Sequence, residues 1–600
     1  MSKQKDLCQI LADCDGRNDR FYEGDVESAI GNLRKQLEDN GQEIDIDIKA
    51  EQMAFGFSEN HEDDENGWGT YFGPMAIFPN DQGQMMESPS LALVDSQMLS
   101  YWAKRANHAK HPILKARYSG LVWDFNNKVN GKSADIRMAH IRIDAVCDIA
   151  RENCHKYETD VITKLKHALE LAIRINDKNR ITQVRDAIIT YEGNIAEDGK
   201  CGLWGFAYDC LWNNKKISLT GDQERKIITD LEERLKRVAN PSDETHVDPW
   251  AAEAAAIRLA KHYRRENRQE EVRRVMLTYG QVFEKISESA NAMLAMKWLQ
   301  DVAQNYRAYG LTEEANRILI KIRELGPKAN SELKPMSAEM EISQEEMTQY
   351  VEEMTQGDLN ECLARLVAHY IPRRDETEKQ VKDIASKALL TSLFQKTIQD
   401  HKGRPIAVIG SIHEDLDGHI IFHISQNMQI ESVFLRQVII ASIKKFTLTS
   451  DTLAEYVFQC PLFENDKRLI IAEGLRRYFK KDALIAIHLL IPQIENALRN
   501  LVEGAGGVVL KPSRNSAVQS LQLRTFDEIL RDPIILQVLG EDVSLYFRTL
   551  FTDPRGINLR NDVCHGLAPE RMFGVGLADR VLHALLALAQ VRKKEGDSNG

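Results

Sequence analysis

The sequence predicts a mainly α-helical fold, with a repeat-like array of helices in the N-terminal half and a helical bundle at the C-terminal end. Apolar residues recur at the helical period almost continuously from Leu91 to Gly326. Two parts of this stretch align with each other at a spacing of 43 residues. Helical patterns resume at Asp466 and continue toward the end of the chain, and a short β element is expected near residues 405–424.

A chain of 600 residues is too long for one hydrophobic core, so we expect several domains. Composition and periodicity indicate six segments: an N-terminal helical segment with an acidic loop (1–90), a helical repeat-like region (91–329), a linker (330–343), a helical connecting domain with short strands (344–460), a helical bundle (461–594) and a disordered tail (595–600).

The net charge of −12 argues against a protein that coats DNA nonspecifically, because such binding neutralises many phosphates. Residues 461–600 carry 19 Lys and Arg against 17 Asp and Glu, so the C-terminal segment is the better partner for a polyanion. No stretch approaches eighteen uncharged apolar residues, so we expect no membrane span. The start, MSKQKDLCQI, lacks the apolar core of a secretory signal, and we expect a cytoplasmic protein.

The nine cysteines form no CxxC pair, which argues against a zinc knuckle or a thioredoxin-like site, and we expect free, mostly buried thiols. The acidic run Glu62–Glu65 lacks the alternation of an EF-hand and is predicted to be solvated loop. The glycines of 504–507 precede Lys511 without the spacing of a phosphate-binding loop. The sequence therefore predicts neither a metal nor another cofactor.

The first 55 residues contain amphipathic helical material, and the loop that follows, to Ser90, has an extended piece around Tyr71–Phe72. In the repeat-like region, eight residues recur 43 positions later: Ala260, Tyr263, Arg264, Glu270, Glu271, Arg274, Val275 and Met276 correspond to Ala303, Tyr306, Arg307, Glu313, Glu314, Arg317, Ile318 and Leu319. A fainter third copy lies at Ala172–Ala187. This period is typical of paired-helix solenoids, whose concave surfaces bind partners, so we expect an unidentified protein or ligand to bind here.

The region between the linker and the bundle is predicted to begin with helix and to contain two strands. Ser343 is a plausible N-cap for a helical pattern from Gln344 to His401. The β-branched runs Ile406–Ile409 and His419–Ile424 flank an Asp-Gly turn and predict short strands. Further helices are expected at these ranges: Lys467–Lys481, Ala483–Glu503 with Pro492 inside it, Phe526–Leu530, Ile534–Leu550 and Gly576–Val591.

The segment Asn558-Leu-Arg-Asn-Asp-Val-Cys-His-Gly566 concentrates the residues suited to chemistry. Asn558 is a good N-cap, and Gly566 with Pro569 marks the end of the helix. Asn561 and His565 are four apart and share a helical face that the long side chain of Arg560 can reach. The expected core-facing residues are Leu559 and Val563, and Cys564 is interpreted as a small buried side chain.

The order Arg560-Asn561, a few further residues, then His565 resembles the signature of the HEPN superfamily. Arg105 and His111 also fit this bare pattern, but Pro112 follows them at once and no final helix does. The runs HLLIPQIENALRNLV (488–502), GVVLKPS and NLRNDVCHGL resemble a DUF4209-type C-terminal region. That family includes the endoplasmic-reticulum-membrane-associated RNA degradation protein of animals, and the likeness covers about residues 370–590. HPILKARYSGLVWDF (111–125) resembles a segment that accompanies this domain in bacterial proteins.

The resemblance implies a HEPN-like bundle that cleaves RNA without metal, through attack by the 2′-hydroxyl. His565 is then the general acid or base, Arg560 binds phosphate oxygens, and Asn561 orients the imidazole or donates to the phosphate. It also implies a homodimer through the C-terminal bundle with a composite site, and a role as a toxin or in defence against phage. The alternative is a non-catalytic HEPN module that binds a protein, RNA or a nucleotide on a helical scaffold.

Two further groups of residues are candidates for supporting roles. His488, Pro492, Glu495 and Arg499 share one helical face, so Glu495 can hold Arg560 and His488 can line the cleft. Glu495 and Arg499 could equally form an ordinary surface pair. Arg476, Arg477, Lys480 and Lys481 form a basic strip that either contacts RNA or is a solvated face.

Overall fold

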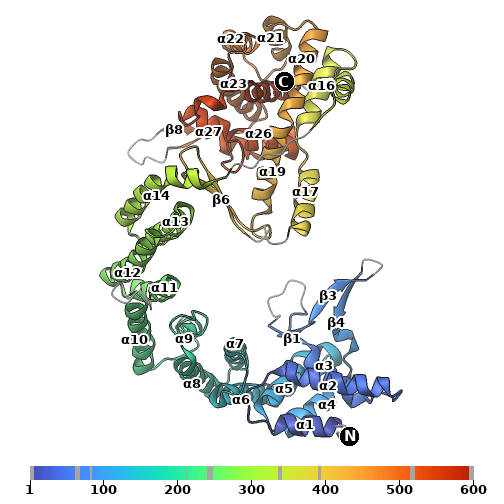
Figure 1. The fold of residues 1–600 in the computed structure, drawn as a ribbon, viewed down its shortest axis with the longest axis vertical. Helices are drawn as coiled ribbons and strands as arrows, with labels where there is room; N and C mark the ends of the chain where they lie inside the picture. The colour runs from blue at the N-terminus through green and yellow to red at the C-terminus, as the bar shows by residue number, and fades with distance from the viewer. Residues whose placement is uncertain are drawn as a thin grey trace. The chain divides into compact units, whose positions relative to one another are not determined.

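The computed structural model describes residues 6–60, 68–80, 84–212, 214–239, 247–334, 341–388, 394–513 and 520–592. The protein is mainly α-helical, as the sequence predicts, and its described strands form two-stranded antiparallel hairpins (Figure 1). The chain divides into two compact units, Met1–Leu319 (unit 1) and Ile320–Gly600 (unit 2). The predicted acidic run at 62–65 and the predicted tail at 595–600 lie outside the described residues.

Unit 1 consists of helices joined by short connections. Its helices are α1 Leu7–Asp15, α2 Glu23–Asp39, α3 Ile46–Gly56, η1 Leu91–Leu93, α4 Ser96–His108, α5 Pro112–Asn130, α6 Ile136–Glu152, α7 Glu158–Arg174, α8 Lys178–Ile195, α9 Phe206–Leu211, α10 Gly221–Val238, α11 Pro249–Arg265, α12 Gln269–Ser287, α13 Ala292–Ala308 and the first part of α14 Thr312–Glu332. Its hairpins pair β1 Ser58–Glu59 with β2 Phe72–Gly73, and β3 Ala76–Pro79 with β4 Met85–Ser88. The expected extended piece around Tyr71–Phe72 is confirmed by β2.

The predicted repeat corresponds to two successive helix pairs, α11–α12 and α13–α14. Tyr263 and Tyr306 occupy matching positions near the ends of α11 and α13, and both are buried. Small alanines on the same faces are also buried, which lets neighbouring helices pack closely. The fainter third copy falls on α7 and α8, which form another helix pair.

A cluster of buried and half-buried charged residues links the first helices of unit 1 to α7. Lys164 Nζ lies 2.9 Å from Glu23 Oε1 and 2.6 Å from Glu59 Oε2. Arg117 Nη1 lies 2.9 Å from Glu59 Oε1, and His155 Nε2 lies 3.1 Å from Glu23 Oε2. Burial alone would raise the pKa of Glu59, but Lys164 and Arg117 hold it at about 2. These five residues (the unit 1 charge cluster) are held together by their mutual pairing.

Unit 2 is a helical bundle with two hairpins. Its helices after α14 are α15 Gln344–Met354, α16 Leu359–Tyr370, α17 Arg374–Lys387, α19 Leu416–Ile430, α20 Ser432–Lys445, α21 Ser450–Val457, η2 Asn465–Lys467, α22 Arg468–Phe479, α23 Ala483–Gly504, α24 Phe526–Leu530, α25 Pro533–Leu539, α26 Glu541–Phe551, α27 Leu559–Cys564, η3 Glu570–Met572 and α28 Val575–Ala589. Its hairpins pair β5 Lys396–Gln399 with β6 Pro405–Ile409, and β7 Leu510–Pro512 with β8 Leu521–Leu523.

The predicted strand at His419–Ile424 is wrong, because this segment belongs to helix α19. The Asp415 side chain accepts a hydrogen bond from the backbone N–H of Gly418 and caps the helix, so the Asp-Gly pair begins a helix instead of a turn. Ile420, Ile421 and Ile424 are fully buried, a spacing that one helical face provides. Burial of this face overrides the β-propensity of the isoleucines.

The predicted strand at Ile406–Ile409 is confirmed by β6, but its partner is β5. Residues 396–399 therefore leave the helix that was expected to reach His401, and the helical pattern from Gln344 divides into α15, α16 and α17. Ser343 caps α15, as predicted, and a reciprocal bond from its backbone N–H to the Glu346 carboxylate completes the cap. The expected linker begins later than predicted, since α14 continues to Glu332, and residues 335–340 lie outside the described part.

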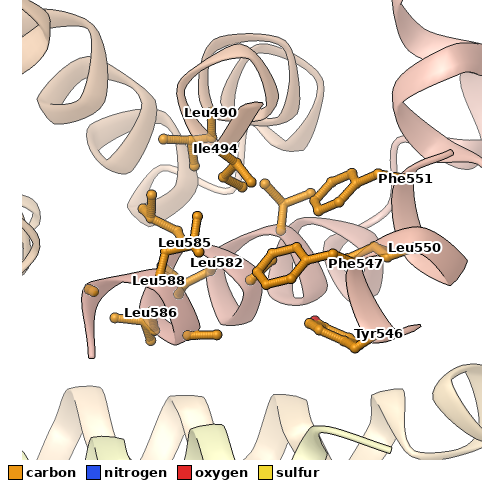
Figure 2. Close-up of a cluster of buried hydrophobic side chains, with 14 of the residues drawn as sticks. Leu490, Ile494, Tyr546, Phe547, Leu550, Phe551, Leu582, Leu585, Leu586 and Leu588 are labelled. Atoms are coloured by element: carbon orange, nitrogen blue, oxygen red, sulfur yellow. The ribbon is translucent and has the colours of Figure 1, made fainter. Parts of the chain in front are cut away.

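One buried core joins the segments 344–460 and 461–594, which the sequence had separated. Figure 2 shows Leu582 and Leu585 of α28 pointing toward Leu490 and Ile494 of α23, with Phe547 of α26 beside them. The predicted helix at 534–550 is split at Gly540, whose φ of +83° separates α25 from α26. Helix α28 is buried from Ala578 to Ala589, so it is the centre of unit 2.

Three polar residues inside α28 find partners within the core. Asp579 accepts from the Tyr478 hydroxyl at 2.6 Å, and Arg580 donates to the Met428 carbonyl at 2.8 Å. His583 lies 2.7 Å from the Tyr546 hydroxyl, and burial lowers its pKa to about 3. This imidazole is neutral near pH 7 and fully buried, so it serves the fold and cannot meet a substrate.

Candidate active site

The segment that carries Arg560 and His565 is positioned by a tight connection after α26. The Asp553 carboxylate accepts from the backbone N–H of Arg555 at 3.0 Å, and the backbone N–H of Ile557 donates to the Thr549 carbonyl at 2.8 Å. Gly556 is required here, because an added Cβ would lie 2.4 Å from the Thr549 carbonyl oxygen. The connection therefore fixes where α27 starts relative to α26.

Helix α27 holds its place through two apolar side chains, Leu559 and Val563, which are buried as predicted. The predicted N-cap is wrong, because Asn558 adopts a φ of +56° and its side chain makes no capping bond. Its amide instead donates to Asp562 Oδ1 at 3.3 Å. Gly566 ends the helix with a φ of +66°, which confirms the predicted stop.

Arg560 reaches a carboxylate on α23, as the helix-face argument predicts. Its Nε lies 2.9 Å from Glu495 Oε2, and its Nη2 lies 3.4 Å from Glu495 Oε1. Arg499 pairs with the same carboxylate, which is 7% exposed. Two guanidinium groups thus share one carboxylate (the arginine triad: Arg560, Glu495 and Arg499) and retain net positive charge. Arg560 is 24% exposed, so it can also receive an anion from outside.

Asn561 has a different role from the one expected. Its amide nitrogen donates to the Asn558 side chain at 2.8 Å and to the Thr552 carbonyl at 3.2 Å, and its oxygen accepts from Arg560 at 3.4 Å. These bonds tie α27 to the end of α26 and help to orient Arg560. The amide protons are therefore used within the fold and do not orient the imidazole.

His565 is exposed at the C-terminal end of α27, where its backbone N–H donates to the Asn561 carbonyl at 3.0 Å. Its imidazole is accessible to a substrate, as a general acid or base must be. Cys564 beside it is also exposed, so the prediction of a buried thiol is wrong. The core-facing positions of this short helix are taken by Leu559 and Val563, which leaves Cys564 on the outer side.

The remaining candidate residues are placed less favourably. The His488 ring stacks on Phe573 with 5.2 Å between ring centroids, and its Nδ1 lies 2.7 Å from the Leu484 carbonyl. In the basic strip, Arg476 and Arg477 both pair with Glu473, and Arg477 also approaches Asp482 at 3.4 Å. Lys480 and Lys481 are exposed. Acidic neighbours offset both arginines, which favours the solvated-face interpretation of this strip.

The second match to the Arg-to-His pattern belongs to the fold of unit 1. Arg105 pairs with Glu51 at 3.2 Å and lies over the Tyr118 ring. His111 is buried, and its Nδ1 accepts from the backbone N–H of Ile113 at 3.3 Å as the N-cap of α5. Neither side chain is presented to a substrate, which agrees with the exclusion of this pair on sequence context.

A cavity of about 290 Å³ lies between the β5–β6 hairpin and α27 (the hairpin cavity). His401, Arg404 and Asp400 line it from the hairpin, and Asn558 and Asp562 line it from the α27 side. Burial raises the pKa of the Asp562 carboxyl, while His401 and His565 act in the opposite direction. Sequence reasoning missed His401 and Asp562. The position of Asp562 one turn before His565 was a usable signal, whereas His401 carried none.

Within the residues that the structure describes, no cluster of three or more His, Cys, Asp or Glu side chains could hold a metal ion. All nine cysteines are free, but only four of them are buried, so the expectation of mostly buried thiols is wrong. None of the described helices combines the length and the apolar content needed to cross a membrane.

Residues 64–184 match the model of a family described as a domain of unknown function, DUF7380. This segment lies in unit 1 and includes α4 to α7, so it does not extend to α27. No curated protein matches the chain. Among solved structures, a circular tandem repeat protein with novel repeat topology and enhanced subunit contact surfaces matches with 13% sequence identity and a TM-score of 0.15. That match covers 82% of this chain and 91% of the other chain.

Proposed function

We propose that unit 2 is a metal-independent endoribonuclease of the HEPN type, with His565 and Arg560 as its catalytic residues. The observation that carries the proposal is the exposed His565 imidazole at the end of the helix whose Arg560 belongs to a net positive arginine triad. Phosphodiester cleavage requires a proton-transfer group and a cationic group that stabilises the phosphate in the transition state.

In the proposed reaction the 2′-oxygen of one ribose attacks the adjacent phosphorus. A P–O2′ bond forms and the P–O5′ bond breaks, which leaves a 2′,3′-cyclic phosphate and a 5′-hydroxyl end. The 2′-hydroxyl loses a proton and the leaving 5′-oxygen gains one, and His565 carries out one of these transfers. Arg560 binds the nonbridging oxygens, where negative charge grows in the transition state. Glu495 holds the Arg560 fork in place.

The test is cleavage of labelled RNA by the purified full chain in EDTA, with end-group analysis of the products. Wild type should yield cyclic phosphate ends, and His565→Ala and Arg560→Ala should each lower the rate by roughly 10²–10⁴-fold. Cys564→Ser is the matched control, since Cys564 is exposed beside His565 and has no proposed role. Equal rates for wild type and His565→Ala would remove the basis of the proposal.

A non-catalytic HEPN module remains the second candidate, and one observation favours it. Arg560 is engaged by Glu495, and Asn561 is engaged by Asn558 and Thr552, so both residues already serve the fold. A binding module would retain RNA or a nucleotide without cutting it. RNA binding that is lost in Arg560→Ala, together with absence of cleavage by wild type, would support this candidate.

A homodimer through unit 2 is part of the proposal, because the HEPN resemblance implies two modules that face each other. The β7–β8 hairpin supplies a surface for it. Leu510 pairs across the strands with Leu523, and Pro512 pairs with Leu521, so these side chains share one face of the hairpin. Leu510 is 43% exposed, Leu521 is 65% exposed and Leu523 is 55% exposed. An exposed apolar face of this kind is typical of a protein–protein contact.

We further propose that the helix pairs of unit 1 bind an unidentified protein or ligand and that the nuclease acts as a toxin or in defence against phage. The support is the stack of paired helices, an architecture that presents extended binding surfaces. Expression of wild type should slow bacterial growth, and expression of His565→Ala at the same level should not.

A further inference from the structure

The hairpin cavity is bounded by two elements that lie far apart in the sequence. Asp400 builds the hairpin turn, because its carboxylate accepts from the backbone N–H groups of Lys402 and Arg404, both at 2.9 Å. The same carboxylate accepts from Arg404 Nε at 2.6 Å. Gly403 approaches the backbone of Gly326 so closely that a Cβ there would lie 2.0 Å from the Gly326 oxygen. The turn that carries His401 is therefore fixed in place.

On the opposite side, α27 presents Asn558 and Asp562 to the cavity. His565 follows Asp562 by three residues, which is about one helical turn, so both lie on the same side of the helix. Asp562 is electrostatically coupled to both His401 and His565. Asp562 thus lines the same cavity as His401 and precedes His565 by about one helical turn.

The lining of the hairpin cavity suits a nucleotide. Ile406, Ile557 and Met572 supply apolar surface on which a base can lie, while His401, Arg404 and Asn558 supply polar groups for its edges or its ribose. A volume of about 290 Å³ is close to the lower limit of small-ligand pockets, roughly 300–1,000 Å³, so the cavity has room for one nucleotide unit.

We propose that the hairpin cavity binds the nucleotide next to the scissile phosphate and that His401 is a second proton-transfer residue, paired with His565 in the same chain. The inference rests on the proposed ribonuclease function and adds a substrate pocket and a partner for His565. The charged groups that line the cavity with His401 are Asp400 and Arg404 on the hairpin and Asp562 on α27, and His565 follows Asp562 at the end of that helix.

Two imidazoles balance the protons of the cleavage. The neutral imidazole accepts the 2′-hydroxyl proton as the P–O2′ bond forms, and the protonated imidazole donates its proton to the 5′-oxygen as the P–O5′ bond breaks. Asp562 stabilises whichever imidazole carries the proton. No redox step and no additional reactant is needed.

The first experiment compares cleavage by wild type, His401→Ala, His565→Ala and His413→Ala in EDTA. His413 is the matched control, since it is exposed just after the hairpin and does not line the cavity. His401→Ala should lower the rate by roughly 10²–10⁴-fold, and His413→Ala should leave it unchanged. If His565→Ala is inactive while His401→Ala cleaves like wild type, this inference is overturned and the proposed function stands.

A substrate with a bridging sulfur at the 5′-position separates catalysis from structural damage. A thiolate leaves without being protonated, so loss of the general acid is tolerated on this substrate. Either His401→Ala or His565→Ala, but not both, should regain activity on it. Rescue of neither variant would contradict the assignment of two proton-transfer residues.

A second experiment measures RNA binding to the hairpin cavity and does not depend on cleavage. An RNA oligonucleotide with 2′-O-methyl groups cannot react, so its affinity reports on the cavity alone. Ile406→Trp should fill the cavity and weaken binding by about tenfold. Val408→Trp is the matched control, because Val408 lies on the same strand face outside the cavity and is 42% exposed, against 43% for Ile406. Equal affinities of the two variants, or no measurable binding by wild type, would overturn the proposed pocket.

Discussion

Replacing Glu495 with Gln removes the charge that holds Arg499 and Arg560 together while keeping the size of the side chain. In the native protein one nearly buried carboxylate is shared by two guanidinium groups. After the substitution a neutral amide lies between the guanidinium groups of Arg499 and Arg560. The amide NH₂ is itself a donor, so it cannot accept a hydrogen bond from either guanidinium group. We expect α23 and α27 to open more readily.

The expected loss of free energy in Glu495→Gln follows from the burial of the Glu495 carboxylate. Breaking a buried ion pair by removing one partner costs about 3–5 kcal/mol. Arg499 is 17% exposed and Arg560 is 24% exposed, so water partly compensates both guanidinium groups. The free energy of opening should therefore fall by about 3 kcal/mol, the lower end of that range. Glu503→Gln is the matched control, because Glu503 is exposed on the same helix.

The measurement has to report on unit 2. All seven tryptophans lie between residues 68 and 298, so tryptophan fluorescence follows unit 1. Hydrogen exchange read by mass spectrometry on peptides from α23 and α27 measures the opening of these helices directly. A loss of about 3 kcal/mol corresponds to exchange that is faster by roughly two orders of magnitude.

The result that would refute the reasoning is unchanged protection of both helices in Glu495→Gln, equal to that in Glu503→Gln. Arg560 would then be held by packing alone, and its pairing with Glu495 would not position it. A second outcome discriminates stability from catalysis. If protection falls as expected but RNA cleavage is unaltered, Arg560 does not need Glu495 in order to bind the phosphate.

Three further predictions concern the unit 1 charge cluster and the hairpin face. Lys164→Met leaves two half-buried carboxylates without their ammonium partner and should destabilise unit 1 by about 3 kcal/mol, the lower end of the range for a buried pair, measured by urea unfolding with tryptophan fluorescence; unchanged stability would contradict the pairing. The folded pKa of Glu59, about 2, lies below its ordinary 4.5, so its contribution is complete above about pH 5 and is lost as the pH falls toward 2. Unfolding midpoints that are equal at pH 7 and pH 3 would argue against this. Leu521→Asp with Leu523→Asp should convert a dimer to a monomer in light scattering, and a dimer that survives would exclude this hairpin face.

The helices could be predicted wherever the information lies within a few residues. Ser343 is the predicted N-cap of α15, and Tyr263 and Tyr306 mark the predicted helix pairs. The failure at His419–Ile424 has the same local origin. β-Branched residues are compatible with a strand, and the burial of one helical face of α19 decides the outcome.

The candidate site was predictable in part. The shared helical face led to the contact between Glu495 and Arg560, which lie 65 positions apart. The same reasoning assigned Asn561 to the imidazole, whereas its amide binds Thr552. Side-chain partners of this kind depend on the path of the chain before α27, which local spacing does not describe.

The sequence by itself determined that the protein is mainly helical, where most helices lie, and that Arg560 and His565 occupy one short segment. These properties depend on periodicity and capping, which act over one or two helical turns. The tertiary structure alone decided that residues 344–460 and 461–594 share one core and that His401 lies across a cavity from Asp562. Such proximity arises from the packing of the whole unit, because the distance between remote residues is set by every element that packs between them.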